Sequence, residues 1–304
     1  MKRSAIIRII VFALIILMLG WLLAAGIARE NRVPVAPNTS DSTTPTDKTS
    51  AGAEGRETSA SGTGSGTRRA SHEITELEID WVSGSVTVQP GDTDVILYEE
   101  TGSFDSKYAM VATESEHKLK IDFCEDSVAK EFEFHIGMNL NADSPKKDLT
   151  VTVPRNWECT KLTIENVSAP VSLSGLSVGE LEYDGVSGTF TLTDCTVNDL
   201  SADTVSGGIS FSGTLEEADL DTTSGSIQMT LSDPAKSIEV DSVSGGVDIA
   251  YPDNCGFTAR FDAVSGKFSS EIGVTASNGT YISGDGSCRI RMDSVSGGMR
   301  IHRK

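Results

Sequence analysis

One carboxylate recurs at a fixed position along most of this sequence, and it is the residue here best suited to chemistry. It stands three residues before each of eight serines, which lie in Val-Ser-Gly or a close relative of that tripeptide. The carboxylates are Asp80, Glu165, Asp184, Asp203, Asp221, Asp241, Asp262 and Asp293. The serines are Ser83, Ser168, Ser187, Ser206, Ser224, Ser244, Ser265 and Ser296. Glycine follows the serine in every copy but the second, which has Ala169-Pro170.

A repeated carboxylate of this kind is compatible with three kinds of chemistry. In a turn, it can accept hydrogen bonds from the backbone N–H groups that follow it. Stacked in a column, it can bind cations such as Ca²⁺, and the candidates are Asp184, Asp203, Asp221, Asp241 and Asp262. A pair of carboxylates in a cleft can hydrolyse a glycosidic bond, but eight equivalent ones fit that chemistry poorly. The turn interpretation is favoured, because Ca²⁺ loops normally hold several acids and each copy here holds one.

The serine and the glycine also have a structural interpretation. The four histidines (His72, His117, His135 and His302) lie far apart and none recurs in phase with the serine, so a catalytic serine is not indicated. We expect the hydroxyl to bond locally to the backbone and the glycine to supply a positive φ. The sequence therefore predicts no catalytic, cofactor-binding or metal-binding residue. It predicts a structural turn motif made by Asp184, Ser187, Gly188, Asp203, Ser206, Gly207, Asp241, Ser244, Gly245, Asp293, Ser296 and Gly297.

The five cysteines give no metal motif. They are Cys124, Cys159, Cys195, Cys255 and Cys288, and none forms Cys-x-x-Cys. One disulfide stays open as an alternative, but its pairing cannot be assigned from the sequence. Buried free thiols that pack as small hydrophobic groups are the default expectation.

Apolar residues alternate with polar ones around each serine, which is the periodicity of a β-strand. From Ser168 onward the serines are 19, 19, 18, 20, 21 and 31 residues apart, and the longest interval contains an extra Ile282-Ser283-Gly284. A unit this short cannot bury its apolar side chains alone, so successive units must stack. The predicted fold is all-β, a parallel β-solenoid with coils of about 19 residues. A β-sandwich is the alternative, but it gives no reason for a fixed phase.

The stacking has consequences at both ends of the repeats. Equivalent residues should form interior ladders, and we expect these to include the valines before the serine, such as Val186, Val205 and Val243. Strand-like segments at 94–99, 110–114, 118–123, 131–140 and 149–153 are out of register with the repeat. We therefore expect an irregular N-terminal part or cap at 73–165 and regular repeats at 166–304. The last strand should be an open edge, protected by Arg300, His302, Arg303 and Lys304.

The N-terminal quarter of the chain differs from the repeats. Residues 9–28 are a run without charge, long enough for a transmembrane helix and longer than the apolar part of a typical signal peptide. This predicts a cytoplasmic N-terminus at 1–8, an anchor at 9–28 and a flexible Ser/Thr/Gly/Pro linker at 29–72. The expected location is the cell membrane, with a single pass and the C-terminal domain outside the cytoplasm.

The charge of the chain limits its partners. It has 25 Lys and Arg against 44 Asp and Glu, a formal net charge of −19. Nucleic-acid binding requires clustered basic residues, so no nucleic-acid partner is expected.

The strand Leu149–Pro154 (Leu-Thr-Val-Thr-Val-Pro) and the repeated Asp-x-Val-Ser-Gly pattern resemble a known family. Residues 73–304 are similar to the putative-adhesin family of bacterial envelope proteins. The resemblance implies a β-solenoid with a surface or envelope role, linked in some relatives to envelope stress, and it supplies no catalytic or ligand residues. The function we expect is a non-enzymatic, adhesin-like interaction module whose partner is a cell-wall polymer or an envelope protein. A Ca²⁺-binding solenoid and a wall-polysaccharide hydrolase or lyase remain alternatives.

Overall fold

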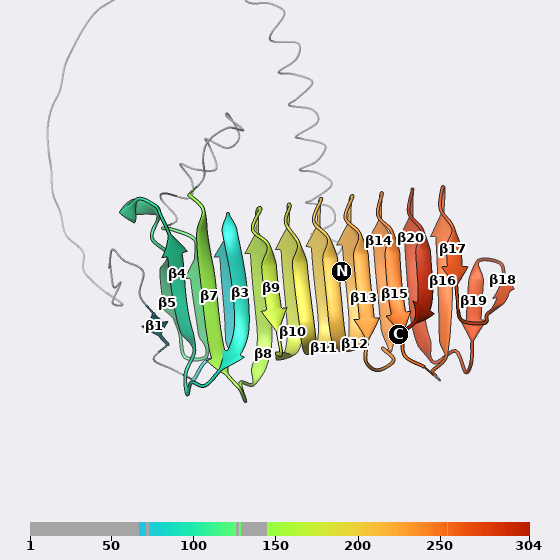
Figure 1. Cartoon of the computed structure of the whole chain (residues 1–304), viewed down its shortest axis with the longest axis horizontal. Coiled ribbons are helices and arrows are strands. Elements are labelled where there is room, and N and C mark those ends of the chain that lie inside the picture. Colours follow the sequence, from blue (N-terminus) through green and yellow to red (C-terminus); the bar gives the residue numbers. More distant parts are fainter. Residues whose placement is uncertain (1–66, 71–72, 126–127, 129–144, 254) are drawn as a thin grey trace, which may run out of the picture. The chain divides into compact units, whose positions relative to one another are not determined.

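The computed structural model describes residues 67–70, 73–125, 128, 145–253 and 255–304, and these form β-strands in two rows (Figure 1). The first row holds β2 (Glu76–Trp81), β6 (Lys118–Asp122), β8 (Cys159–Asn166), β10 (Ser177–Gly185), β14 (Ser237–Ser242), β16 (Phe257–Ala263) and β20 (Cys288–Ser294). The second row holds β3 (Gly84–Gly91), β7 (Lys147–Pro154), β9 (Val171–Ser174), β13 (Ile227–Leu231), β15 (Val247–Tyr251), β17 (Phe268–Ser270) and β21 (Met299–Arg303). Two long strands, β11 (Phe190–Thr204) and β12 (Ile209–Thr222), begin in the second row and end in the first.

Each coil is one strand of the first row, a connection and one strand of the second row, and the connection is a Val-Ser-Gly turn or a close relative in every coil except β6–β7. Neighbouring coils pair in parallel and in register, for example Tyr183 with Ile164 on one side and with Ala202 on the other. Second-row residues such as Ile209 and Ile227 pair in the same way. Their side chains point into the stack and are buried, so the apolar residues form continuous interior ladders.

The coils do not follow one another in sequence order at either end. The last coil, β20–β21, lies between β14–β15 and β16–β17. The first coil, β2–β3, lies between β6–β7 and β8–β9. The expectation that β21 is an open edge is therefore wrong, because it pairs with β15 and with β17. The expectation that segments 118–123 and 149–153 are out of register is also wrong, because β6 and β7 form an additional coil.

Antiparallel strands pair with the outermost coil at each end of the parallel stack. At one end β4 (Leu97–Gly102) pairs with β7, β1 (Arg68–Arg69) pairs with β4, and β5 (Val111–Glu114) pairs with β6. At the other end β19 (Thr280–Ser283) pairs with β16, and β18 (Thr275–Ser277) pairs with β19. The extra residues in the long interval before Ser296 form the hairpin β18–β19. A short 3₁₀ turn, η1 (Ser106–Tyr108), lies between β4 and β5.

The predicted fold class needs a correction, because it included a membrane-spanning helix. In the residues that the structure describes, no helix has both the length and the apolar character needed to cross a membrane. The predicted tail at 1–8, anchor at 9–28 and most of the linker at 29–72 lie outside those residues, as does the segment 131–140. What the structure shows is a β-fold of mostly parallel coils with antiparallel caps.

The valine before the serine is not an interior residue. Val186 and Val295 are both 52% exposed, and Val243 is 40% exposed. These valines still stack on equivalent residues of neighbouring coils, because Ser206 N–H donates to Val186 O and Ser296 N–H donates to Val243 O. The expectation that they line the interior is wrong, since the chain turns its corner at this position and points the side chain outward.

A buried lysine joins the first two coils to the antiparallel cap. The ammonium of Lys147 lies 2.9 Å from Glu100 Oε2, and both side chains are buried. It donates hydrogen bonds to the backbone carbonyls of Tyr108 and Phe123. Three aromatic rings lie 4.2–5.0 Å from it, those of Trp81, Phe104 and Phe123. Burial lowers the pKa of Lys147, and Glu100 opposes that effect.

We predict that Lys147→Met destabilises the fold by roughly 3–5 kcal/mol, because it removes the closer cation of the buried Glu100 carboxylate and leaves only Arg68, 3.8 Å away. The neighbouring Lys146 is exposed, so Lys146→Met is the matched control and should change stability by less than about 0.5 kcal/mol. Urea denaturation of both variants measures the two effects. Equal stability of the two variants would contradict this role for Lys147.

At Gly207 and Gly225 the turns between the rows stack so closely that a side chain cannot fit. A Cβ at Gly225 would lie 1.8 Å from the carbonyl oxygen of Gly207, and a Cβ at Gly207 would lie 2.0 Å from that of Gly188. Gly207 and Gly225 do not have a positive φ, although Gly188 does. The expectation that glycine supplies a positive φ therefore holds at Gly188 but not at Gly207 or Gly225, where close backbone contact is the reason.

We predict that Gly225→Ala lowers the free energy of unfolding by roughly 1–3 kcal/mol, because the turns must separate to admit the methyl group. Gly208→Ala is the control, since its nearest new contact would be an ordinary 3.5 Å. Thermal and urea denaturation should separate the two variants. A tolerated Gly225→Ala would show that close stacking of the turns is not required.

Candidate functional site

The outer side of the first row is strongly acidic in its middle. The first-row parts of β10, β11, β12 and β14 contribute three, two, three and two outward carboxylates and no outward Lys or Arg, while Glu216 at the corner of β12 pairs with Lys236, 2.6 Å away, just before β14. We call these ten residues the acidic face: Glu180, Glu182, Asp184, Asp199, Asp203, Glu217, Asp219, Asp221, Glu239 and Asp241. Each is exposed or half-exposed, because strand alternation turns it away from the core.

Basic residues border this face on both sides. Lys161 in β8 lies 2.9 Å from Glu180 Oε1 and 2.9 Å from Glu182 Oε2. On the other side, β20 presents Arg289 and Arg291 next to β14, and Arg291 pairs with Asp293. The negative charge is therefore concentrated in four consecutive coils.

The stack brings the repeated carboxylates together in one column. Asp80, Glu165, Asp184 and Asp203 pair in register along the first row. The column continues through Asp221 and Asp241, then reaches Asp293 before Asp262 because of the inserted last coil.

One member of the column was missed in the sequence. Asp122 pairs with Asp80, but Phe123-Cys124 follow it in place of Val-Ser-Gly. A signal was present, because Lys118-Leu-Lys-Ile-Asp-Phe repeats the alternation of Glu76-Leu-Glu-Ile-Asp-Trp. The match at the apolar positions could have placed this segment in phase.

Three carboxylates of the column and one beside it have raised pKa values. Burial raises the pKa of Glu165, and the charges of Asp80 and Asp184 raise it further. Burial also raises the pKa of Asp184 and of Asp199, with contributions from nearby carboxylates. The pKa of Asp122 rises to about 6, first through burial and then through its hydrogen bond with Asp80, although Lys120 opposes the shift.

The hydrogen bonds of the turns differ from the expected ones. The N–H of Gly207 donates to Thr204 Oγ1 at 3.0 Å, and that of Gly225 donates to Thr222 Oγ1 at 2.8 Å. In the second copy, Asn166 Oδ1 accepts from Ala169 N–H. The side chain that caps these turns is thus the buried polar residue after the acid, which the sequence reasoning overlooked.

The repeat serine connects neighbouring coils. Ser206 Oγ donates to the carbonyl of Val186 at 3.1 Å, and the Ser206 N–H donates to the same oxygen. Ser187 and Ser224 make the equivalent pair of bonds to Val167 and Val205. The hydroxyl therefore bonds to the adjacent coil and not within its own turn, which corrects the local bond that we expected.

The alternatives for the carboxylates gain no support from the geometry. Within the described ranges, no group of three or more His, Cys, Asp or Glu side chains is placed to hold a metal ion.

All five cysteines are free thiols, and burial raises the pKa of Cys159 to about 12 and of Cys288 to about 11. Neither thiol is therefore poised as a nucleophile.

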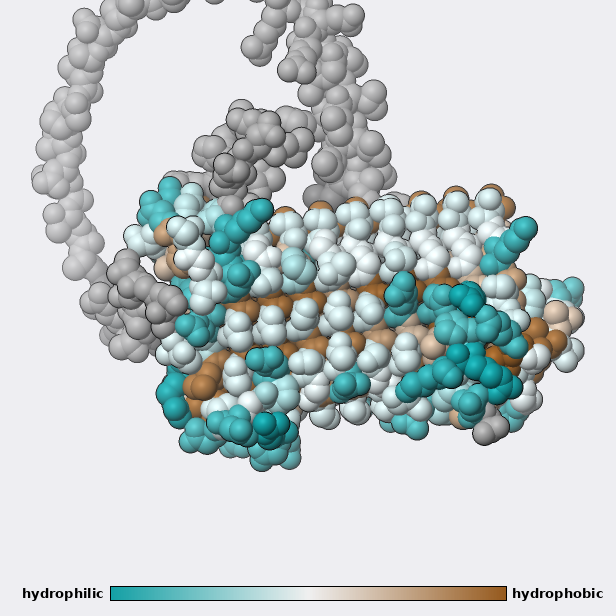
Figure 2. All heavy atoms as spheres, viewed as in Figure 1, coloured by the Kyte–Doolittle hydropathy of each residue, from teal (hydrophilic) through white to brown (hydrophobic). Residues whose placement is uncertain are grey.

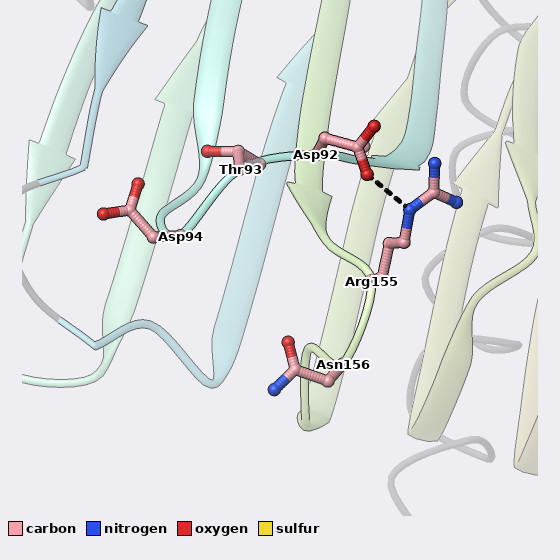
Figure 3. Close-up of a pocket in the computed structure, with 6 residues that line it drawn as sticks. Asp92, Thr93, Asp94, Arg155 and Asn156 are labelled. Atoms are coloured by element: carbon pink, nitrogen blue, oxygen red, sulfur yellow. Dashed lines mark hydrogen bonds and ion pairs between the residues drawn. The ribbon is translucent and has the colours of Figure 1, made fainter.

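A shallow depression lies at the end of β3 and β7, and Figure 3 shows the residues around it. Asp92 points toward Arg155, and their Oδ1 and Nε atoms are 2.7 Å apart. The second acid, Asp94, pairs with Arg69 at 3.0 Å. Arg155 lowers the pKa of Asp92, whereas a general acid needs a raised pKa. The depression does not provide the chemistry of a glycosidase.

A family model described as Toastrack DUF4097 matches this chain over residues 74–230 and 211–302. The chain belongs to the Toastrack DUF4097 family. This confirms the resemblance to the putative-adhesin proteins. A comparison with curated proteins finds no match.

Three solved structures are similar to this Toastrack chain. Each match covers 79% of this chain and nearly the whole length of the solved structure. A putative adhesin from Bacteroides fragilis is 15% identical with a TM-score of 0.49 and is covered to 98%. A putative adhesin from Parabacteroides distasonis is 14% identical with a TM-score of 0.44 and is covered to 96%. A putative cell adhesion protein from Clostridium sporogenes is 10% identical with a TM-score of 0.38 and is covered to 99%. Scores this low support no further inference.

We predict that the Toastrack domain becomes more stable as the pH falls from about 7 to about 5. The folded-state pKa of Asp122 lies above its ordinary value of 3.8, so the folded chain binds a proton there that the unfolded chain does not. The free energy of unfolding should rise by about 1 kcal/mol, and Asp122→Asn should flatten the rise. Urea titrations at several pH values measure it, with the exposed Asp233→Asn as the control. Stability that falls over this range would contradict the assignment.

Proposed function

We propose that this chain is a non-enzymatic, adhesin-like interaction module that acts outside the cytoplasm and binds a cationic partner of the cell envelope. The acidic face carries this proposal. Its ten carboxylates lie on four consecutive coils in parallel lines, with basic side chains only at its borders. Such a surface attracts positively charged polymers or proteins and repels nucleic acids and anionic lipids.

The family and the shape of the site are consistent with this role. Two of the similar solved structures are described as putative adhesins. Their low identity to this chain means that they carry no argument about its function. The depression beside Asp92 supports no acid–base chemistry, because both of its carboxylates pair with arginines. Electrostatic binding to a repeated surface therefore explains more of the described residues than catalysis does.

The proposal predicts that beads coated with the full chain adhere to a poly-L-lysine surface and not to neutral agarose. Adhesion should decrease several-fold when the salt concentration rises to about 0.5 M, because exposed charges are screened. The test variant neutralises three exposed members of the acidic face by Asp199→Asn, Glu217→Gln and Glu239→Gln. We expect it to lose roughly tenfold in binding, since three of ten charges are removed from one surface.

The control for this experiment removes the same charge elsewhere. It carries Glu73→Gln, Glu158→Gln and Asp233→Asn, which are exposed and lie outside the acidic face. Equal losses in both variants would mean that net charge, and not this surface, causes the binding. Release of reducing sugar ends from purified cell-wall glycan by the full chain would instead support the hydrolase alternative.

A further inference from the structure

A straight row of exposed valines runs along one edge of the stack. Six large hydrophobic side chains are exposed among the described residues, and five of them occupy the position before the repeat serine. These five are Val167, Val186, Val243, Val264 and Val295. Figure 2 shows hydrophobic groups along the upper rim, where Figure 1 has the turns that join the two rows. We call residues 167, 186, 205, 223, 243, 295 and 264, in this order of stacking, the valine row.

The fold itself does not require valine at this position. Thr223 occupies it in one coil and makes the same backbone bonds as its neighbours, since Ser244 N–H donates to Thr223 O as Ser206 N–H does to Val186 O. Threonine has the same branched shape as valine, and exposing its side chain to water costs less free energy. An aligned series of exposed apolar groups on a chain this charged marks an interaction surface.

The carboxylate column runs beside the valine row. The acid stands two residues before the valine in each coil, as in Asp184 and Val186 or Asp293 and Val295. The acid is the next-to-last residue of its strand and the valine is the first residue beyond that strand, and both side chains are at least partly exposed on this edge. Neighbouring coils repeat this arrangement every ~4.8 Å, so one line of apolar groups lies parallel to one line of negative charge.

The complement of this edge has an apolar line with basic groups on one flank. An extended strand that alternates apolar and basic residues does not fit, because its basic side chains would point away when its apolar ones face the valines. An amphipathic helix fits, since its apolar stripe repeats every ~5.4 Å and the residues at its flank lie beside the stripe. We propose that the valine row and the adjacent carboxylate column form a docking edge for a basic amphipathic helix of a partner protein.

This inference rests on the proposed function, because it names the kind of cationic partner and its place on the acidic side of the stack. Charge attracts the helix, and burial of the valines holds it in one orientation. The acidic face then supplies long-range attraction, while the docking edge supplies the selectivity for an apolar stripe.

The experiment compares two labelled peptides of about 18 residues, or roughly five helical turns. Both contain the same numbers of Leu and Lys, but only one has its leucines on a single face. Fluorescence anisotropy with the full chain, below the concentration at which the peptides self-associate, should give at least about fivefold tighter binding of the striped peptide. In the variant Val186→Thr, Val243→Thr and Val295→Thr, we expect this preference to disappear while the scrambled peptide binds as before.

A matched control carries Val95→Thr, Val111→Thr and Val274→Thr, which are half-buried valines outside the row. It should keep the preference, and thermal denaturation checks that all variants are folded. Equal binding of both peptides to the wild-type chain overturns the docking edge but leaves the proposed cationic partner in place. Binding of neither peptide overturns both, and loss of preference in the control overturns the assignment to this row.

Discussion

The close stacking of the Val-Ser-Gly turns is the constraint on which the rest of the structure depends. A Cβ at Gly245 or Gly297 would lie 2.0 Å from the carbonyl oxygen of the turn below, as at Gly207. At these glycines only backbone fits between the stacked turns, so each of these coils has one position relative to its neighbour. The serine reinforces this, because its N–H and its hydroxyl both donate to one carbonyl of the adjacent coil. A slip by one residue would break both bonds and turn every apolar side chain outward.

Fixed register turns each repeat position into a column, with favourable and unfavourable results. Inside the stack, buried residues such as Leu181 and Leu200 form ladders that stabilise the fold. Outside, carboxylates lie side by side, and burial together with neighbouring carboxylates raises the pKa of Glu165 and Asp184. Basic side chains could have been placed among them, yet Lys161 and Arg291 lie only at the borders. The chain therefore keeps a surface on which like charges repel one another, a repulsion that neutral side chains would avoid. This supports a binding role for the surface.

Much of this could be predicted from the sequence, because a phase repeated eight times specifies which residues share a column. The carboxylate column from Asp80 to Asp293 and the interior ladders followed from that phase alone. The hydrogen bonds of the serines could not be predicted in this way. The partner of Ser206 lies in another coil, and the sequence does not state how close the two coils come. The capping role of Thr204 and Thr222 was hidden for a related reason, since threonine is also an ordinary strand residue. Asp122 escaped because its coil lacks the turn tripeptide.

The order of the end coils could not be predicted, because a motif that is the same in every coil carries no information about its neighbours. The long interval before Ser296 shows only that this connection has extra residues. It does not show that β19 pairs with one side of β16 and β20 with the other. The physical reason for the detour lies at the edges of the sheet. A parallel stack that ended on its last coil would expose unpaired N–H and C=O groups and could join another chain. By placing β20–β21 inside and adding the hairpin β18–β19, the chain pairs both sides of β20 and, through β19, the outer side of β16. At this end the hairpin covers β16, whereas β17 pairs among the described strands only with β21, so growth by stacking is hindered along the first row and less so along the second.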